Sequence, residues 1–500
     1  MAGQPGAPAG HEGRAVCSRN RWRRWARSLL PWLLPTLTAV VFFLSLSHEA
    51  ARRVLALETV ENYGFAVFNQ ILWNFSHFGK FAQTIHRGYF DSWMWSGHKA
   101  AWLPVVGYLY SIRPGPIWLA QIQIGAVALG AFPAFALGRL VVGGLGGGIL
   151  GLVFYFAYPP LYYMALSDYQ DIVLAIPTLL FALHACRKRS VPAFVVTALL
   201  ACATREEVAL MVMLLGFAVS GTWRTRVKFG TIGAFVAISY LATVYALFHD
   251  EMYYESSAQT QLAAILSHLP SLPPILYDKA EAVRFYAGFL RPVQWIGLGA
   301  PWTLLPAAGA FIVHLFVNPG NGVDRVWATQ AHIHHLAPIL PLLIAAALET
   351  VGRVGRRIRK ASRLPRHTHR VVAVVLAVVA VAGTVPTWRA LGLHFQTNLE
   401  TRQYPVHPVW KLVRRLPPDS VVATDMFASL AVSSRPLAYT YDESLVEKVR
   451  TRDPLDALDA ILVNRRDTVW LRRALSRTGA RVLDAQGEYV LILLRQRSSG

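Results

Sequence analysis

Long apolar segments alternate with short polar ones along most of the chain. The first, SLLPWLLPTLTAVVFFLSLS at 28–47, has the ~20 residues that a helix needs to cross a ~30 Å hydrocarbon core. Further apolar segments follow between 116 and 387, and each must cross to the side opposite the one before it. Two of these spans fit between 281 and 317, with a split near 299–301. The pattern predicts roughly eleven transmembrane α-helices, because open-ended helices satisfy all their backbone groups in lipid.

The first apolar segment also sets the expected orientation. Residues 1–27 are rich in Gly, Pro and Ala and then in Arg, which predicts a disordered, basic cytoplasmic tail. The apolar run at 28–47 is longer than the 7–15 residues usual in a signal peptide, so a retained anchor is favoured over a cleaved leader. A transmembrane domain over 28–387 is therefore expected, and its long first outer loop would cover 48–115.

The C-terminal residues 388–500 differ in pattern from the rest of the chain. SVVAT, DAILVN, RVLDA and YVLILLR have the composition of strands, whereas HPVWKLVRRL and VWLRRALSRTG have the spacing of amphipathic helices. This alternation predicts a small extracytoplasmic α/β domain. Neither GxGxxG nor GxxxxGK[ST] occurs there, so no nucleotide site is indicated.

Composition agrees with a membrane protein. The 500 residues are 54% hydrophobic and 15% charged, against about a quarter charged in soluble domains. The net charge of +21 lies in short runs such as RKRS and TWRTRVK, which is the distribution that the positive-inside rule produces. These runs are dispersed and contain no nucleic-acid-binding motif, so a nucleic-acid partner is not expected. The three cysteines are scattered and indicate neither a disulfide framework nor a zinc site.

Unusual polar residues all map to the outer side, at or just beyond the ends of predicted spans. Ionisable residues near membrane depth are expensive and therefore suggest function. They are Glu58, Glu61, Asn69, Gln70, Asp91 and His98 in the first loop, Asp168 and Asp171 in SDYQD, Arg205, Glu206 and Glu207 in TREE, and His332, His334 and His335 in AHIHH.

Each of the acidic candidates has a structural alternative. Glu61 is either a general base at the membrane surface or a helix N-terminal residue favoured by the dipole. His98 precedes an apolar run, and a lone histidine in such a place is more often structural than functional. Asp168 and Asp171 are either helix caps or a pair on one helix face that suits a metal or acid/base chemistry. A divalent cation is therefore compatible with the sequence, although no cofactor is identified.

The basic candidates also have two interpretations. Arg205 lies in a very tight turn, where its guanidinium either packs among helix ends or clamps a phosphate. The spacing of His332, His334 and His335 does not match HExxH or another zinc pattern. Contact of His334 and His335 with a lipid-linked phosphate is chemically reasonable.

The order of several motifs resembles the bacterial integral-membrane family DUF2079, which is similar to the GT-C glycosyltransferases. The resemblance covers most of 55–350 and extends into the C-terminal domain. The matching segments are YGFAVFNQILWN, GHKAAWLPVVGYLYSIRPGPIWLAQIQ, SDYQDIVLAIP, TREEVAL, HHLAPILPLL and LPPDSVVATDMFASLAVSSRPLAY. By resemblance, the positions of functional family residues carry Gln70, His98, Asp168 and Glu206.

This resemblance implies a GT-C-like membrane enzyme that transfers a sugar from a polyprenyl-phosphate donor at the outer face of the bacterial inner membrane. The family's first-loop acids fall on Gly64 and Asn69 here, and Gln170 replaces a family histidine. Either Glu61 supplies the base or this member has lost transfer chemistry.

The expected partners are membrane lipid, a lipid-linked sugar donor, and a glycan or protein acceptor. The mechanism that follows has Glu61 as base, with Arg205, His334 and His335 on the departing phosphate. A non-catalytic lipid- or glycan-binding assembly protein is the first alternative. A secondary transporter is the second alternative, although no internal repeat is seen.

Overall fold

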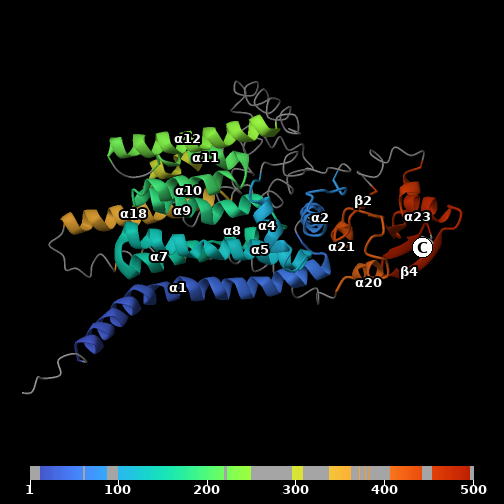
Figure 1. Cartoon of the computed structure of the whole chain (residues 1–500), viewed down its shortest axis with the longest axis horizontal. Coiled ribbons are helices and arrows are strands. Elements are labelled where there is room, and N and C mark those ends of the chain that lie inside the picture. The colour runs from blue at the N-terminus through green and yellow to red at the C-terminus, as the bar shows by residue number, and fades with distance from the viewer. Residues whose placement is uncertain are drawn as a thin grey trace, which may run out of the picture.

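The computed structural model describes residues 12–59, 62–86, 100–218, 222–248, 296–307, 337–361, 406–441 and 453–495, with four single positions between 371 and 382. It consists of a helical bundle and a small C-terminal α/β unit (Figure 1). Glu61, Asp91, His98, His332, His334 and His335 lie outside the described residues.

The N-terminal helix α1 runs from Glu12 to Ala56 along one side of the bundle (Figure 1). It begins at Glu12, within the interval 1–27, where the disordered basic tail expected from the sequence stays a prediction. The Ala- and Arg-containing segment after Glu12 has good helix propensity and continues the apolar helix that follows it. Leu33, Leu37, Val41 and Leu44 are exposed along one face, as expected of a helix that faces lipid.

The next part of the bundle is a helical hairpin. Helices α5 (Pro116–Leu129) and α6 (Ala131–Gly138) lead through the π-helical turn η1 (Arg139–Gly143) into α7 (Gly144–Phe156). Gly143 and Gly144 have positive φ angles and reverse the chain there, which confirms the turn predicted between two spans. The apolar segment Pro116–Phe156 of 41 residues is therefore two antiparallel passes.

The remaining helices complete the bundle. They are α8 (Pro159–Leu166), η2 (Asp171–Leu174), α9 (Ala175–Arg187), α10 (Val191–Cys202), α11 (Glu206–Leu215), α12 (Trp223–Phe248) and α18 (Ile339–Ala361). Helix α9 and the first half of α18 are almost entirely buried and form the centre of the bundle. Helix α8 begins at Pro159, and α10 has Pro192 as its second residue; proline is preorganised for the first helical turn.

By length and composition, three helical segments of the described residues qualify as membrane spans. They are Leu30–Ala56, Pro116–Phe156 and Trp223–Leu247. The predicted number of roughly eleven spans stays a prediction, because much of 249–295 and 308–336 lies outside the described residues.

The C-terminal unit contains a five-stranded sheet of order β2-β1-β3-β5-β4. Strands β1 (Val422–Thr424), β2 (Ala438–Thr440) and β3 (Ala460–Asn464) are parallel, whereas β5 (Tyr489–Leu493) is antiparallel to β3 and to β4 (Arg481–Gln486). The short helices are α20 (Val409–Val413), α21 (Ser429–Val432), η6 (Pro454–Ala457) and α23 (Thr468–Leu475). The four strands and two helices predicted from the sequence are present, so a small α/β fold is confirmed.

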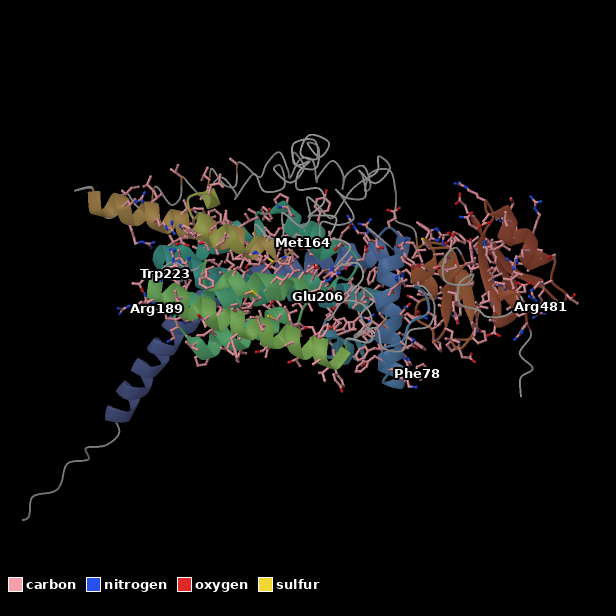
Figure 2. All side chains as sticks on the ribbon, turned by 90° about the horizontal axis from the view of Figure 1, so that it is seen from above. Phe78, Met164, Arg189, Glu206, Trp223 and Arg481 are labelled. Atoms are coloured by element: carbon pink, nitrogen blue, oxygen red, sulfur yellow. The ribbon has the colours of Figure 1, made fainter. Side chains whose placement is uncertain are left out.

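Two helices of the first loop lie between the bundle and this unit. Helix α2 (Asn62–Phe78) crosses the direction of the bundle helices and contacts the C-terminal unit, and α4 (Leu103–Tyr110) lies beside it (Figure 1). The predicted loop 48–115 is therefore partly helical. Figure 2 shows the resulting polarity: Arg189 and Trp223 lie at one end of the bundle, whereas Met164 and Glu206 lie toward the C-terminal unit.

Candidate functional site

The turn SDYQD joins α8 to η2 and is held in place by one buried side chain of α5. Gln123 donates from Nε2 to the carbonyl oxygens of Met164 at 2.9 Å, Ser167 at 3.1 Å and Asp168 at 3.1 Å. Its Oε1 accepts from the backbone N of Gln170 at 2.7 Å. Gln123 was not among the predicted site residues, although an amide within an apolar span is a usable signal.

The turn TREE lies beside SDYQD, so the structure brings these two predicted motifs together. Arg205, at the N-cap of α11, is 3% exposed, and its Nη1 lies 4.0 Å from Asp171 Oδ1 and 3.9 Å from Glu207 Oε1. Asp168 is buried in the same SDYQD turn. The two carboxylates offset part of the cost of burying the guanidinium, which makes this an ionic cluster at the end of the bundle.

Helices α4 and α12 border this ionic cluster. Trp102 donates from its backbone N to the carbonyl of Ala203 at 3.2 Å and from Nε1 to that of Leu200 at 2.7 Å. Helix α12 packs against α10 and α11, the two helices that the TREE turn connects. The start of α4 therefore lies at the TREE turn.

The chemistry of this cluster is acidic overall. Four carboxylates, those of Asp168, Asp171, Glu206 and Glu207, lie in two adjacent turns with the single guanidinium of Arg205. Such groups can accept protons, orient hydroxyls or contribute oxygen ligands to a cation. Among the described residues, no group of three or more His, Cys, Asp or Glu side chains is arranged to hold a metal ion.

Helix α2 directs its amides toward the C-terminal unit. Gln70 Oε1 accepts from the backbone N of Thr84 at 2.8 Å and of Ile85 at 3.2 Å, and Nε2 donates to Thr84 Oγ1 at 3.0 Å. Thr84 in turn accepts from the backbone N of Ala438 in β2 at 3.0 Å. Gln70 therefore ties α2 and the segment after it to the edge of the sheet. A direct role of Gln70 in lipid-phosphate binding stays a prediction.

Asn69 has a similar structural environment. Its Oδ1 accepts from the Tyr110 hydroxyl at 2.8 Å, and its Nδ2 donates to Ser433 Oγ at 2.8 Å and Ser434 Oγ at 3.1 Å. This is the position at which the resemblance placed a family acid. A neutral amide here joins α2, α4 and the C-terminal unit.

Asn62, the first residue of α2, is hydrogen-bonded to the segment that follows α1. Asn62 donates from Nδ2 to the carbonyl of Leu57 at 2.7 Å and accepts from Thr59 Oγ1 at 2.6 Å. The predicted roles of Glu61, His98, His334 and His335 stay predictions, since these four lie outside the described residues.

A second polar cluster lies at the carboxyl end of β1 in the C-terminal unit. Asp425 accepts from the Tyr489 hydroxyl and from the backbone N of Ala428, each at 2.8 Å, and burial raises the pKa of its carboxyl. The His407 ring lies edge-on to Phe427 and Tyr489, with centroid distances of 5.7 and 5.9 Å. The backbone N of His407 donates to the carbonyl of Leu55 at the end of α1 at 2.8 Å. This cluster therefore forms part of the contact between the C-terminal unit and the bundle.

Comparison with curated proteins gives no match, whereas several solved structures share the fold, among them two of one ArnT. ArnT from Cupriavidus metallidurans bound to undecaprenyl phosphate matches with a TM-score of 0.50 at 14% sequence identity, covering 91% of this chain and 97% of ArnT. The apo state of the same ArnT gives a TM-score of 0.51 at 14% identity, with the same coverage. At this identity the likeness establishes the fold alone.

The chain also matches the model of one protein family. The model for predicted membrane proteins of the type DUF2079 matches residues 53–491, which is most of the chain and includes the C-terminal sheet. This match confirms the family that the ordered motifs indicated, and the fold shared with ArnT agrees with the predicted GT-C-like architecture. The chain belongs to the DUF2079 family of predicted membrane proteins.

Proposed function

We propose that this protein acts on a polyprenyl-phosphate-linked sugar as a membrane glycosyltransferase of the GT-C type. One observation carries the proposal: the chain shares its fold, over 91% of its length, with an ArnT that was crystallised with undecaprenyl phosphate. The meeting of SDYQD and TREE at the bundle end nearest the C-terminal unit supports it, because this places four carboxylates and a buried arginine together.

In the proposed reaction, Glu61 accepts the proton of an acceptor hydroxyl. The hydroxyl oxygen attacks the anomeric carbon of the donor sugar, and the bond from that carbon to the phosphate oxygen breaks. Polyprenyl phosphate leaves with the bonding electron pair, and Arg205, His334 and His335 stabilise its charge. Asp168, His98, Gln70 and Glu206 position the substrates.

The environment of Arg205 supports its assignment to the phosphate. Asp171 and Glu207 flank the guanidinium from two different turns, which fixes its position at the bundle end. Arg presents a planar set of donors that matches the oxygens of a phosphate. A phosphate bound there would lie among carboxylates, and a divalent cation supplied with the donor would reduce that repulsion.

The test compares wild type with Glu61→Gln in purified full-length protein, using a panel of radiolabelled polyprenyl-phosphate sugars. We expect wild-type transfer or hydrolysis with at least one donor and its loss in Glu61→Gln. Glu58→Gln is the matched control, since it removes an acid three residues earlier and should leave turnover intact. Equal turnover in wild type and Glu61→Gln would remove Glu61 from the mechanism.

A non-catalytic binder of lipid-linked glycans is the second candidate, and one observation favours it. Asn69 stands where the family resemblance placed an acid, and the amide is occupied by Tyr110, Ser433 and Ser434. In this case wild type would bind a polyprenyl-phosphate sugar without turning it over. Asn69→Asp then tests whether turnover is absent because the base is missing at this position. Turnover gained by that variant would show that it is.

We also propose the orientation of the protein in the bacterial inner membrane: the N-terminus is cytoplasmic and the C-terminal domain is extracytoplasmic. The basic turns at the opposite end of the bundle support it through the positive-inside rule. Single cysteines introduced as Ser476→Cys and Ser190→Cys in intact cells provide the measurement. A membrane-impermeant maleimide should label the first from outside and leave the second unmodified.

A further inference from the structure

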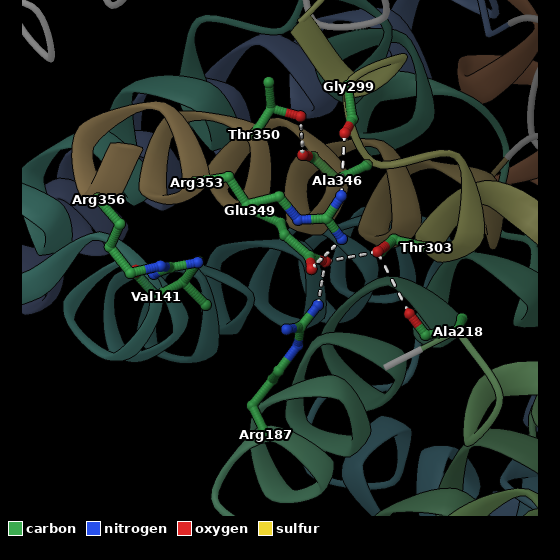
Figure 3. Close-up of polar contacts among 10 residues, drawn as sticks. All are labelled: Val141, Arg187, Ala218, Gly299, Thr303, Ala346, Glu349, Thr350, Arg353 and Arg356. Carbon is green, nitrogen blue, oxygen red and sulfur yellow. Dashed lines mark hydrogen bonds and ion pairs between the residues drawn. The ribbon is translucent and has the colours of Figure 1, made fainter. Parts of the chain in front are cut away.

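The end of the bundle away from the C-terminal unit is defined here as the basic end. It comprises the turn η1, the α9–α10 turn at 187–190, the start of α12 and the second half of α18. Figure 3 shows contacts that join these parts: Arg356 Nη1 donates to the carbonyl of Val141 in η1 at 3.1 Å, and Arg187 at the end of α9 pairs with Glu349 of α18. The parts therefore form one continuous surface.

The only acid among the described residues of the basic end is already neutralised. Glu349 is 1% exposed and pairs with Arg187 and with Arg353, whose Nη2 lies 2.6 Å from Oε1. Thr303 Oγ1 donates to Glu349 Oε2 at 2.6 Å and lies 3.3 Å from the carbonyl of Ala218 (Figure 3). This buried clamp fixes the helices and has no remaining charge to offset other cations.

Arg187, Arg353 and Arg356 have contacts within the bundle, whereas other cations of the basic end are exposed. Among the described side chains, ten cations lie there against the one carboxylate of Glu349: Arg139, Arg187, Lys188, Arg189, Arg224, Arg226, Lys228, Arg353, Arg356 and Arg357. Lys188, Arg224 and Arg357 are exposed, and none has a carboxylate partner among the described residues. Figure 1 shows one end of α18 extending past the ends of α7 and α12.

We propose that the basic end is a docking surface for the headgroups of anionic phospholipids in the leaflet that surrounds it. Exposed apolar residues place this surface at the membrane boundary: Trp223 is 70% exposed at the start of α12, directly beside Arg224. An aromatic ring at that level is typical of the lipid–water interface. Clustered cations next to a span attract anionic lipids by about 1 kcal/mol each, or about fivefold in affinity per residue.

The charge distribution favours phospholipid over a soluble anion. The cations come from four separate segments of the chain: η1, the α9–α10 turn, the start of α12 and the second half of α18. Cations spread over several segments match many headgroups in a plane, whereas a single phosphate needs several donors at one point. The inference is independent of the proposed sugar transfer, because it concerns the opposite end of the molecule.

The experiment uses purified full-length protein in detergent, titrated with phosphatidylglycerol or with zwitterionic phosphatidylcholine, and follows bound lipid by native mass spectrometry and Tm. We expect phosphatidylglycerol to bind more tightly and to raise Tm. The triple variant Lys188→Gln, Arg224→Gln and Arg357→Gln should lose at least about tenfold in affinity for phosphatidylglycerol. The charge-conserving triple variant Lys188→Arg, Arg224→Lys and Arg357→Lys should bind it as wild type does, because the surface attracts headgroups through its charge.

The matched control removes exposed cations at the other end of the molecule, as Arg414→Gln with Arg465→Gln in the C-terminal unit. Its phosphatidylglycerol binding should equal that of wild type. Equal binding of phosphatidylcholine and phosphatidylglycerol, or unchanged phosphatidylglycerol binding in the glutamine triple variant, would overturn the proposal. Stabilisation reproduced by inorganic phosphate alone would also overturn it, since the ligand would then be a soluble anion.

Discussion

Gln123 is the single residue on which the SDYQD turn depends most directly. Replacing it in Gln123→Leu removes four hydrogen bonds and leaves the carbonyls of Met164, Ser167 and Asp168 without this donor. We expect a loss of about 1–3 kcal/mol in stability, since buried polar groups without partners are expensive. Hydrogen–deuterium exchange should show faster exchange at the amide of Gln170, which loses its acceptor.

The control for this prediction is Gln121→Leu, on the same helix and only partly buried. It should leave exchange at 167–171 unchanged. Unchanged exchange in Gln123→Leu as well would show that other contacts hold the turn.

Gln70 and Gln123 show how far a single sequence predicts the role of a buried amide. Both are amides in apolar surroundings, and the family resemblance singled out Gln70 as a binding residue. In the structure both have hydrogen bonds with the backbone of a neighbouring turn. The sequence indicates that such an amide needs partners. One partner of Gln70 is Thr84, and another is the carbonyl of Arg435 in the loop after α21, 365 residues away. Contacts of that separation leave no local pattern.

The hairpin of α6 and α7 depends on glycines at the helix contact. A Cβ at Gly138 would clash with the carbonyl oxygen of Gly147, and one at Gly151 with that of Ala134. Because backbone atoms cannot move aside, we expect Gly151→Ala to destabilise the protein by about 3 kcal/mol. Gly146→Ala is the matched control in the same helix, where a Cβ would meet nothing within 4 Å. It should stabilise by up to about 1 kcal/mol through helix propensity.

Thermal unfolding in one detergent provides the measurement for both glycine variants. Opposite signs of the Tm shift support close backbone packing of the hairpin. A similar shift in the two variants would contradict it.

The Glu349 clamp ties four segments of the bundle together at the basic end (Figure 3). Glu349→Leu would leave Arg187, whose side chain is 8% exposed, without its carboxylate, which costs about 3–5 kcal/mol for a buried pair. We expect a marked fall in Tm. The double variant Glu349→Leu with Arg187→Met should recover most of it, because both buried charges are then absent. A double variant no more stable than Glu349→Leu would show that the charge on Arg187 is not the cause.

At the scale of elements, prediction succeeded where local chemistry decides. The Gly-rich turn of 141–147 and the buried strands around Val422 and Ile461 were found because glycine and short apolar runs act locally. Strand β2 was not among the strands predicted from the sequence.

The arrangement of the whole molecule could be predicted only in part. The alternation of basic turns gave the polarity of the bundle, and Figure 2 shows Arg189 and Trp223 together at one end. The seating of the C-terminal unit on α1 and α2 was not predictable, because it rests on contacts such as Trp410 Nε1 with the carbonyl of Leu55 at 3.0 Å. These contacts join residues about 355 positions apart.

We expect the contact between the C-terminal unit and α1 to depend on pH through His407. Burial lowers the pKa of this imidazole from 6.5, and the nearby carboxylates of Glu488 and Glu58 oppose the shift only in part. A folded-state pKa below the unfolded value means that the neutral ring is favoured in the folded protein. The stability that it contributes is present above the unfolded pKa of about 6.5 and is lost as pH falls through the folded value.

We therefore expect the contact between the C-terminal unit and α1 to weaken as pH is lowered from 7.5 toward 5. Hydrogen–deuterium exchange at the amide of His407, which donates to Leu55, reports the contact directly. In His407→Gln the backbone bond remains and the titrating ring is absent, so the exchange rate, corrected for the intrinsic effect of pH, should lose its dependence in this range. A pH dependence retained in His407→Gln would assign the effect to another group. Since Phe427 and Tyr489 pack against the ring, the variant should also be less stable than wild type at pH 7.5, where the histidine is neutral.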